Sequence, residues 1–173
     1  MMQELSDLKT SILEERYTDA LTIVDQLDGM SRRARIDAIE SFLVRMMIHI
    51  VKNQLEKRLT NSWAASIRGS VVDIKKLNPR DNRTAYYINP DDWHPMLEDA
   101  MEIAIRDASV EVFDGNYSPF QLDEMVNRAS VMAIAHHLIS LTYLHPKREL
   151  PRAVDDYLMQ LPGGEEWKRG SSQ

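Results

Sequence analysis

Cysteine is absent from the sequence, so disulfide bonds, thiolate metal sites and cysteine catalysis are excluded. Glycine occurs only six times. No spacing among the glycines gives the GxGxxG or Walker pattern of nucleotide-binding loops, and no GxSxG of a serine hydrolase occurs. The common signatures of phosphate binding by a loop and of nucleophilic catalysis are therefore missing.

Long apolar runs are missing too. The most apolar long stretch, from Ala129 to Leu144, has 16 residues and contains two histidines, whereas a membrane span needs about 20 apolar residues. The first ten residues, MMQELSDLKT, are polar and acidic and lack the regions of a secretory signal. We therefore expect a buried helix over 129–144, no membrane contact and a cytoplasmic location.

The composition is that of a folded domain, with 43% hydrophobic and 28% charged residues. A chain of 173 residues suits one domain with a sizeable core. The net charge of −6 hides an asymmetry, because residues 31–83 carry a local charge of +7 and the rest of the chain −13. Either the basic and acidic parts face each other, or the segment 31–83 binds an anionic partner such as nucleic acid.

Apolar residues recur at helical spacing almost throughout, and no convincing strand pattern occurs. The sequence predicts an all-α, single-domain bundle of about six or seven helices, with a central helix near residues 31–58. Its N-cap would be Ser31, after an earlier helix that Gly29 ends. We expect a helical bundle over residues 3–145 and a C-terminal extension over 146–173, with a short helix at 151–161 and a frayed tail. The other predicted helices cover about 5–12, 61–77, 95–113, 119–128 and 130–144.

The predicted central helix carries one polar stripe. On a helical wheel Ser41, Arg45, His49, Lys52 and Glu56 share an arc of roughly 80°, while apolar residues cover most of the rest. The stripe is either the solvated edge of a core helix, with a Lys52–Glu56 contact, or part of a protein interface, or one wall of a site.

In the site interpretation, the chain turns back after Arg58, and the amides at the start of the next helix lie beside the stripe. Together with the cations they would bind phosphate or another anion, and His49 could move a proton. We also expect Trp63 to be buried as the anchor between the two helices. The candidate polar or anion site consists of Arg45, His49, Lys52, Glu56, Arg58, Asn61, Ser62, Trp63 and Ser66.

Part of this stretch resembles a known family. The segment from Leu27 to Ile67 has a helix ending in His49-x-x-Lys52, followed by Ser62-Trp63-x-x-Ser66-Ile67, and a helix resembling the family's covers 97–112. Over about residues 5–145 the chain is similar to the bacterial, mainly cyanobacterial, family called domain of unknown function 29. The resemblance implies an all-helical fold and no established activity, and it gives no catalytic residue.

Other chemistry finds little support in the sequence. His136 and His137 are adjacent and so diverge by about 100° on a helix, and no HExxH pair is present. The carboxylates Glu98, Asp99 and Glu102 lack the Glu-x-x-His ligands of di-iron bundles and suggest a solvated face. We expect no metal, no cofactor and no catalytic residue. The leading hypothesis is a non-enzymatic helical protein that acts through a protein partner or by self-association. The alternatives are an anion-binding protein or enzyme at His49, Lys52, Ser62 and Trp63, and a nucleic-acid-binding protein.

Overall fold

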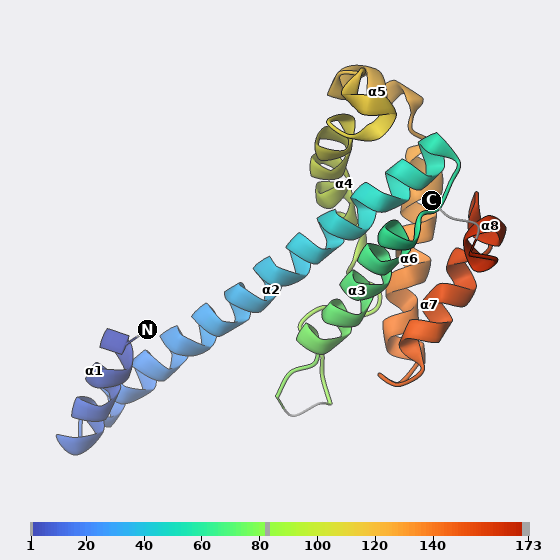
Figure 1. Ribbon diagram of the computed structural model, residues 1–173. Coiled ribbons are helices and arrows are strands. Elements are labelled where there is room, and N and C mark those ends of the chain that lie inside the picture. The colour runs from blue at the N-terminus through green and yellow to red at the C-terminus, as the bar shows by residue number, and fades with distance from the viewer. Residues whose placement is uncertain (1, 82–83, 171–173) are drawn as a thin grey trace. The chain divides into compact units, whose positions relative to one another are not determined.

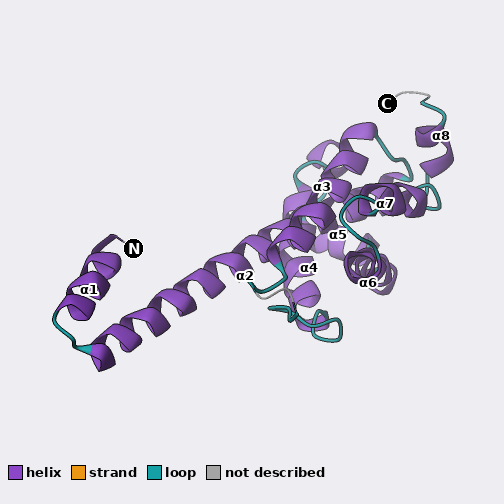
Figure 2. Ribbon diagram, turned by 90° about the horizontal axis from the view of Figure 1, so that it is seen from below, coloured by secondary structure: helices purple, strands orange, loops and turns teal. Residues whose placement is uncertain are grey.

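A computed structural model describes residues 2–81 and 84–170 of the chain. These residues form eight α-helices (Figures 1 and 2) and one 3₁₀ turn. The one β-type pairing among them is an isolated bridge between Pro79 and Tyr86. The prediction of an all-α fold is confirmed. In chain order the elements are α1 (Met2–Leu13), α2 (Tyr17–Glu56), α3 (Asn61–Leu77), α4 (His94–Ser109), η1 (Val112–Gly115), α5 (Pro119–Met125), α6 (Arg128–Leu144), α7 (Leu150–Leu158) and α8 (Gly164–Lys168).

The chain divides into two compact units, Met1–Ala38 and Ile39–Gln173, and the division falls inside α2. The first unit contains α1 and the first part of α2, joined by a three-residue turn, 14–16. The second unit contains the rest of α2 and all later helices. Each unit has its own interior.

Helix α2 is longer than the predicted central helix. The prediction that Gly29 ends a helix and that Ser31 caps the next is wrong, because α2 runs through both positions. A glycine inside a helix lowers helix stability by only about 1 kcal/mol relative to alanine, and the helical residues on both sides can offset this loss. At its other end the helix stops at Glu56 and not at Arg58, since Lys57 takes a left-handed φ of 55°.

The core of the second unit is built around the C-terminal part of α2. Ile39, Leu43, Met46, Met47 and Ile50 are completely buried there. Helix α3 packs against α6 and α7, and α4 packs against α5 and α6 (Figure 1). The apolar spacing of the sequence therefore identified the core side of α2 correctly. Trp63 is buried in the same cluster, as predicted.

The C-terminal residues belong to the core and do not form a separate extension. Leu150, Val154 and Leu158 recur every four residues along α7 and are completely buried, and α7 packs on α3 and α6. The predicted boundary at residue 145 therefore does not match the packing. The predicted frayed tail contains helix α8 instead, and Trp167 packs against the core; the last three residues of that tail lie outside the described residues.

A buried polar network closes the long connection between α3 and α4. The Asn78 side chain is only 3% exposed. Its amide nitrogen donates to the Ile88 carbonyl and to the Tyr143 hydroxyl, both at 2.9 Å, and its amide oxygen accepts from the Ile88 N–H at 2.8 Å. The Tyr143 hydroxyl also accepts from the indole N–H of the buried Trp93 at 2.7 Å. Because every partner is satisfied, this network can lie inside the core.

Candidate functional site

The polar stripe of α2 is tied to the rest of the second unit by specific pairs. Lys52 is only 6% exposed; its ammonium lies 3.1 Å from a Glu111 carboxylate oxygen and 5.1 Å from the centre of the Trp63 ring. The expected Lys52–Glu56 contact is replaced by this long-range pair. A buried ammonium group needs such a partner, so the Glu111 carboxylate explains how the Lys52 side chain can lie in the core.

The Glu56 carboxylate makes hydrogen bonds to two separate segments of the chain. One carboxylate oxygen accepts from the Arg58 guanidinium at 2.9 Å, and the other accepts from the Phe113 N–H at 3.1 Å. Burial alone would raise the pKa of Glu56, but the Phe113 and Arg58 hydrogen bonds outweigh it and lower the pKa below its ordinary value. Glu56 therefore joins the end of α2 to the turn at η1 as an ionised group.

The predicted helix over 61–77 is α3, and its N-cap is Thr60. The Thr60 hydroxyl accepts from the Trp63 N–H at 3.1 Å and lies 3.2 Å from the Ser62 hydroxyl. Asn61 accepts from the Trp167 indole N–H at 3.1 Å. One of the amides expected to bind an anion is thus already satisfied by a side chain.

The remaining predicted site residues make local contacts. A ring nitrogen of His49 lies 2.8 Å from the Arg45 carbonyl, and the Ser66 carbonyl accepts from the Ser70 hydroxyl. The Arg58 guanidinium lies 4.6 Å from the Trp63 ring centre. The structure therefore brings Lys52, Arg58 and Trp63 together. The two cations, however, already contact carboxylates of the chain and the Trp63 ring. These contacts favour a structural role, and the anion pocket stays a prediction.

Replacing each of the two hydroxyl residues near this cap by alanine separates their roles. Thr60→Ala should lower the free energy of unfolding by about 1 kcal/mol, because α3 loses its N-cap. Ser62→Ala should cost clearly less, because its hydroxyl caps no described amide. Urea denaturation of the two variants checks this. Equal losses would mean that Thr60 is not the cap.

The basic segment 31–83 is not a free band of positive charge in its described part, which ends at residue 81. Several of its cations have carboxylate partners, among them Lys52 with Glu111, Arg58 with Glu56, Arg68 with Asp155 and Lys76 with Asp73. Lys75 donates to the Thr142 carbonyl at 2.6 Å. This arrangement gives no particular support to nucleic-acid binding, which stays a prediction.

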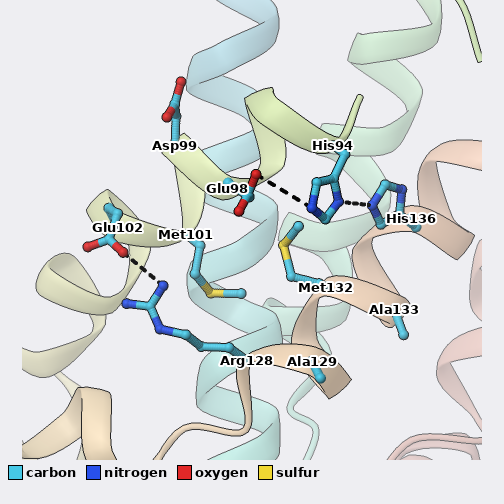
Figure 3. A pocket seen from close by; sticks show the side chains of 10 residues that line it. All are labelled: His94, Glu98, Asp99, Met101, Glu102, Arg128, Ala129, Met132, Ala133 and His136. Atoms are coloured by element: carbon cyan, nitrogen blue, oxygen red, sulfur yellow. Dashed lines mark hydrogen bonds and ion pairs between the residues drawn. The ribbon is translucent and has the colours of Figure 1, made fainter. Parts of the chain in front are cut away.

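An open groove of about 690 Å³ lies between α4 and α6 (Figure 3). At one end a nitrogen of His94 lies 3.0 Å from a nitrogen of His136, and the other nitrogen of His94 lies 3.5 Å from a Glu98 carboxylate oxygen. The sequence reasoning missed His94 altogether. Its only signal was its place just before Pro95 at a helix start. The lining residues are His94, Glu98, Asp99, Met101, Glu102, Arg128, Ala129, Met132, Ala133 and His136.

The two histidines share one hydrogen bond and do not form a metal site. Their ring planes differ by 9° and their centroids are 5.3 Å apart, so with the nitrogens 3.0 Å apart the rings lie nearly in one plane with these atoms facing. Two zinc–nitrogen bonds of about 2.0–2.1 Å along these directions would need about 4 Å between the nitrogens. Among the described residues no group of three or more His, Asp or Glu could hold a metal ion.

The other end of the groove is an ion-pair network. Glu102 contacts Arg128 at 2.8 Å and Arg106 at 3.1 Å, and Arg128 also contacts Asp123 at 2.7 Å. The hydrogen bonds from Arg128 and Arg106 lower the pKa of Glu102. Part of the carboxylate series that suggested a solvated face therefore joins α4 to α5 and α6. Because these groups are largely exposed, we expect only a small contribution to stability from each pair.

The histidine pair predicts how stability changes with pH. Burial, and then the charge of His94, lower the pKa of His136 below its ordinary value of 6.5. In the unfolded chain His136 has its ordinary pKa of 6.5, and in the folded chain its pKa is lower. Its contribution to stability is therefore fully present above pH 6.5 and is lost as the pH falls through the folded-state pKa. The free energy of unfolding should therefore decrease on acidification below 6.5, and less steeply in His136→Gln. Denaturation at a series of pH values measures how steeply the free energy of unfolding falls in the wild type and in His136→Gln. Equal slopes would mean that the pKa of His136 is not lowered by folding. His49, whose pKa burial also lowers, leaves a residual slope of the same sign.

The N-terminal unit has a different kind of surface. Its interior is small: Ser11 and Ala20 are buried, and Leu8, Ile23 and Leu27 are half-buried. Most of its large apolar side chains are exposed, over a range from 38% to 87%. They are Met2, Leu5, Ile12, Leu13, Tyr17, Leu21, Val24 and Met30. A helical hairpin with this pattern has buried its less apolar side and left its more apolar side in water.

The exposed apolar residues gather on one face of the hairpin. At about 100° per residue, Leu5 and Ile12 on α1 and Leu21 and Val24 on α2 each lie about 100° beyond the inner side of their helix, in the same rotational sense. Because α1 and α2 run in opposite directions, equal rotations bring both stripes to the same side. The other side holds a polar groove lined by Asp7, Thr10, Ser11, Arg16, Asp19, Thr22, Ile23 and Gln26. The hairpin is thus amphipathic as a whole.

Comparison of the chain with protein-family models, with curated proteins and with solved structures finds no match. The resemblance to domain of unknown function 29 therefore stays a prediction. No helix in residues 2–81 and 84–170 is both long and apolar enough to cross a membrane.

Proposed function

We propose that this is a non-enzymatic helical protein that acts by binding protein, and that its binding surface is the apolar face of the N-terminal hairpin. The observation that carries the proposal is the cluster of exposed apolar side chains on α1 and the first part of α2. Contiguous apolar surface of this kind on a protein exposed to water usually marks an interaction site.

The energetics favour an interaction at this face. Full burial of a Leu, Val, Ile or Met side chain is worth about 1.5–3 kcal/mol. Leu5, Ile12, Leu21 and Val24 are between 44% and 65% exposed, so covering them yields a useful fraction of that energy. The spacing also fits a helical partner, because residues at i, i+4 and i+7, such as Tyr17, Leu21 and Val24, are the anchors of helix-to-helix packing.

The second unit offers a matched control surface. Leu144 is 71% exposed and Leu21 is 65% exposed, so the two leucines present similar apolar area to water. Leu144 is the last residue of α6, however, and has no stripe of apolar neighbours like that of Leu21. A difference between the two positions in any binding assay therefore reports on the hairpin face and not on apolarity alone.

Photo-cross-linking inside the cells that make the protein tests the proposal. A photoreactive amino acid at Val24 should give adducts with another polypeptide, and the same group at Leu144 should not. Leu21→Asp in the Val24-labelled chain should abolish the adduct, because a buried carboxylate in an apolar interface is strongly unfavourable. Equal labelling from Val24 and Leu144, or no adduct from Val24, would overturn the proposal.

A further inference from the structure

The hairpin face is complementary to itself. We infer that its partner is a second copy of the chain, held in a two-fold symmetric pairing in which α1 of each copy lies along α2 of the other; this rests on the proposed function.

The two stripes match in length and spacing. On α1 the stripe comprises Met2, Leu5, Lys9 and Ile12, and on α2 it comprises Tyr17, Leu21, Val24 and Asp28. Each has four members spaced by three and four residues, which is the pattern of a packing seam between helices. Each spans about three turns. In both stripes three members are apolar or aromatic and one is charged.

The short turn fixes which residues lie at the same height. Only residues 14–16 separate α1 from α2, so positions equally far from this turn are level with each other. Lys9 is then level with about residues 21–22, and Leu5 with about residues 25–26. A symmetry axis parallel to the helices keeps these heights, so α1 of one copy meets α2 of the other in the register that the hairpin already has.

This symmetry gives a familiar bundle. Each of the four helices has two neighbours, one from its own copy and one from the other, and both run in the opposite direction. Opposed helix dipoles favour that arrangement. A second copy supplies the apolar stripes in the required number and spacing, and no other sequence is needed to close the four-helix interior.

Charge supports the same pairing. Lys9 lies within the α1 stripe, and Asp25 borders Leu21 and Asp28 on α2, within about one helical turn of the height of Lys9. In the symmetric pairing each Lys9 comes close to Asp25 of the other copy, twice per dimer. The hairpin's Asp7 and Asp19, by contrast, line the polar groove on the opposite side and stay in water. Repulsion between the acidic residues of the two copies is therefore reduced at the contact itself.

Disulfide cross-linking tests the register, and the absence of cysteine makes each introduced thiol unique. A Leu5→Cys chain mixed with a Val24→Cys chain should give a mixed disulfide under mild oxidation. A Leu5→Cys chain mixed with a Tyr17→Cys chain should not, because position 17 lies about 13 Å along the helix from the height of residue 5. A Leu5→Cys chain with a Leu144→Cys chain is the background control. Preferential linkage of Leu5→Cys to Tyr17→Cys would overturn the antiparallel arrangement.

Charge exchange provides the second arm, read as the dimer dissociation constant. Lys9→Asp and Asp25→Lys should each weaken the dimer by about tenfold, because two attractive contacts become repulsive. The double variant should recover wild-type affinity. No recovery in the double variant would overturn the Lys9–Asp25 pairing. A wild-type chain that stays monomeric at every concentration would overturn the second copy as partner, yet a Val24 photo-adduct with a different polypeptide would leave the proposed function standing.

Discussion

Gly163→Ala is expected to lower the free energy of unfolding by about 3–4 kcal/mol, one of the largest losses available to a single methyl group in this chain. Gly163 has a φ of +74°, which an alanine adopts at a cost of about 1–2 kcal/mol. Its added Cβ would also lie 2.6 Å from the Arg58 Cα and 2.8 Å from the Leu59 nitrogen. Both contacts are with backbone, so the turn after α2 has to move away from the segment before α8.

Gly170→Ala is the matched control. Its φ of +72° is nearly the same, but nothing lies within 4 Å of its added Cβ. Gly170→Ala should therefore show only the conformational cost, and the difference between the variants measures the packing of residue 163 on the α2–α3 turn. Urea denaturation followed by tryptophan fluorescence gives both values. Equal losses would mean that the C-terminal segment does not pack on this turn.

Trp93→Ala is expected to cost about 3–5 kcal/mol, as removal of a fully buried aromatic ring usually does. Trp93 is 1% exposed, and its indole N–H donates to the Tyr143 hydroxyl, which is shared with Asn78. The substitution removes the ring that closes the connection before α4 and opens a cavity beside this network. Denaturation midpoints measured by circular dichroism report the loss directly.

Two further variants show how the cost divides. Trp93→Phe keeps a large part of the ring volume and loses the hydrogen bond, so most of the stability should remain. Trp167→Ala removes a half-buried ring with one hydrogen bond to Asn61 and should cost less than Trp93→Ala. If Trp93→Ala costs no more than Trp167→Ala, Trp93 does not anchor the loop.

Much of the fold follows from local rules in the sequence. The serine, proline and glutamine at 118, 119 and 121 have the spacing of a capping box, and the structure shows that box at the start of α5. The apolar spacing of residues 42–51 identified a core helix. The errors came from single-residue signals whose effect depends on context: Gly29 was expected to end a helix, but its backbone stays helical in α2. The segment 146–173 was expected to be an extension, although Leu150, Val154 and Leu158 carry the helical spacing of a core element.

The candidate surfaces were less predictable because they depend on tertiary contacts. Lys52 pairs with Glu111, which is 59 residues away, and His94 pairs with His136, which is 42 residues away. Neither spacing leaves a pattern in the sequence. The exposed face of the hairpin was equally hidden, since Leu5, Ile12, Leu21 and Val24 have the same helical spacing as core residues. Only the fold shows that the hairpin itself does not cover these residues.

Sedimentation equilibrium of the full chain tests most directly whether the hairpin face joins two copies. The wild type should approach twice the 20.0 kDa of a single chain as its concentration rises. Leu21→Asp should sediment near 20.0 kDa throughout, while Leu144→Asp, which changes a similarly exposed leucine outside the hairpin, should behave as the wild type does. A wild type of 20.0 kDa at all concentrations, or a dimer that both variants weaken equally, would contradict the account.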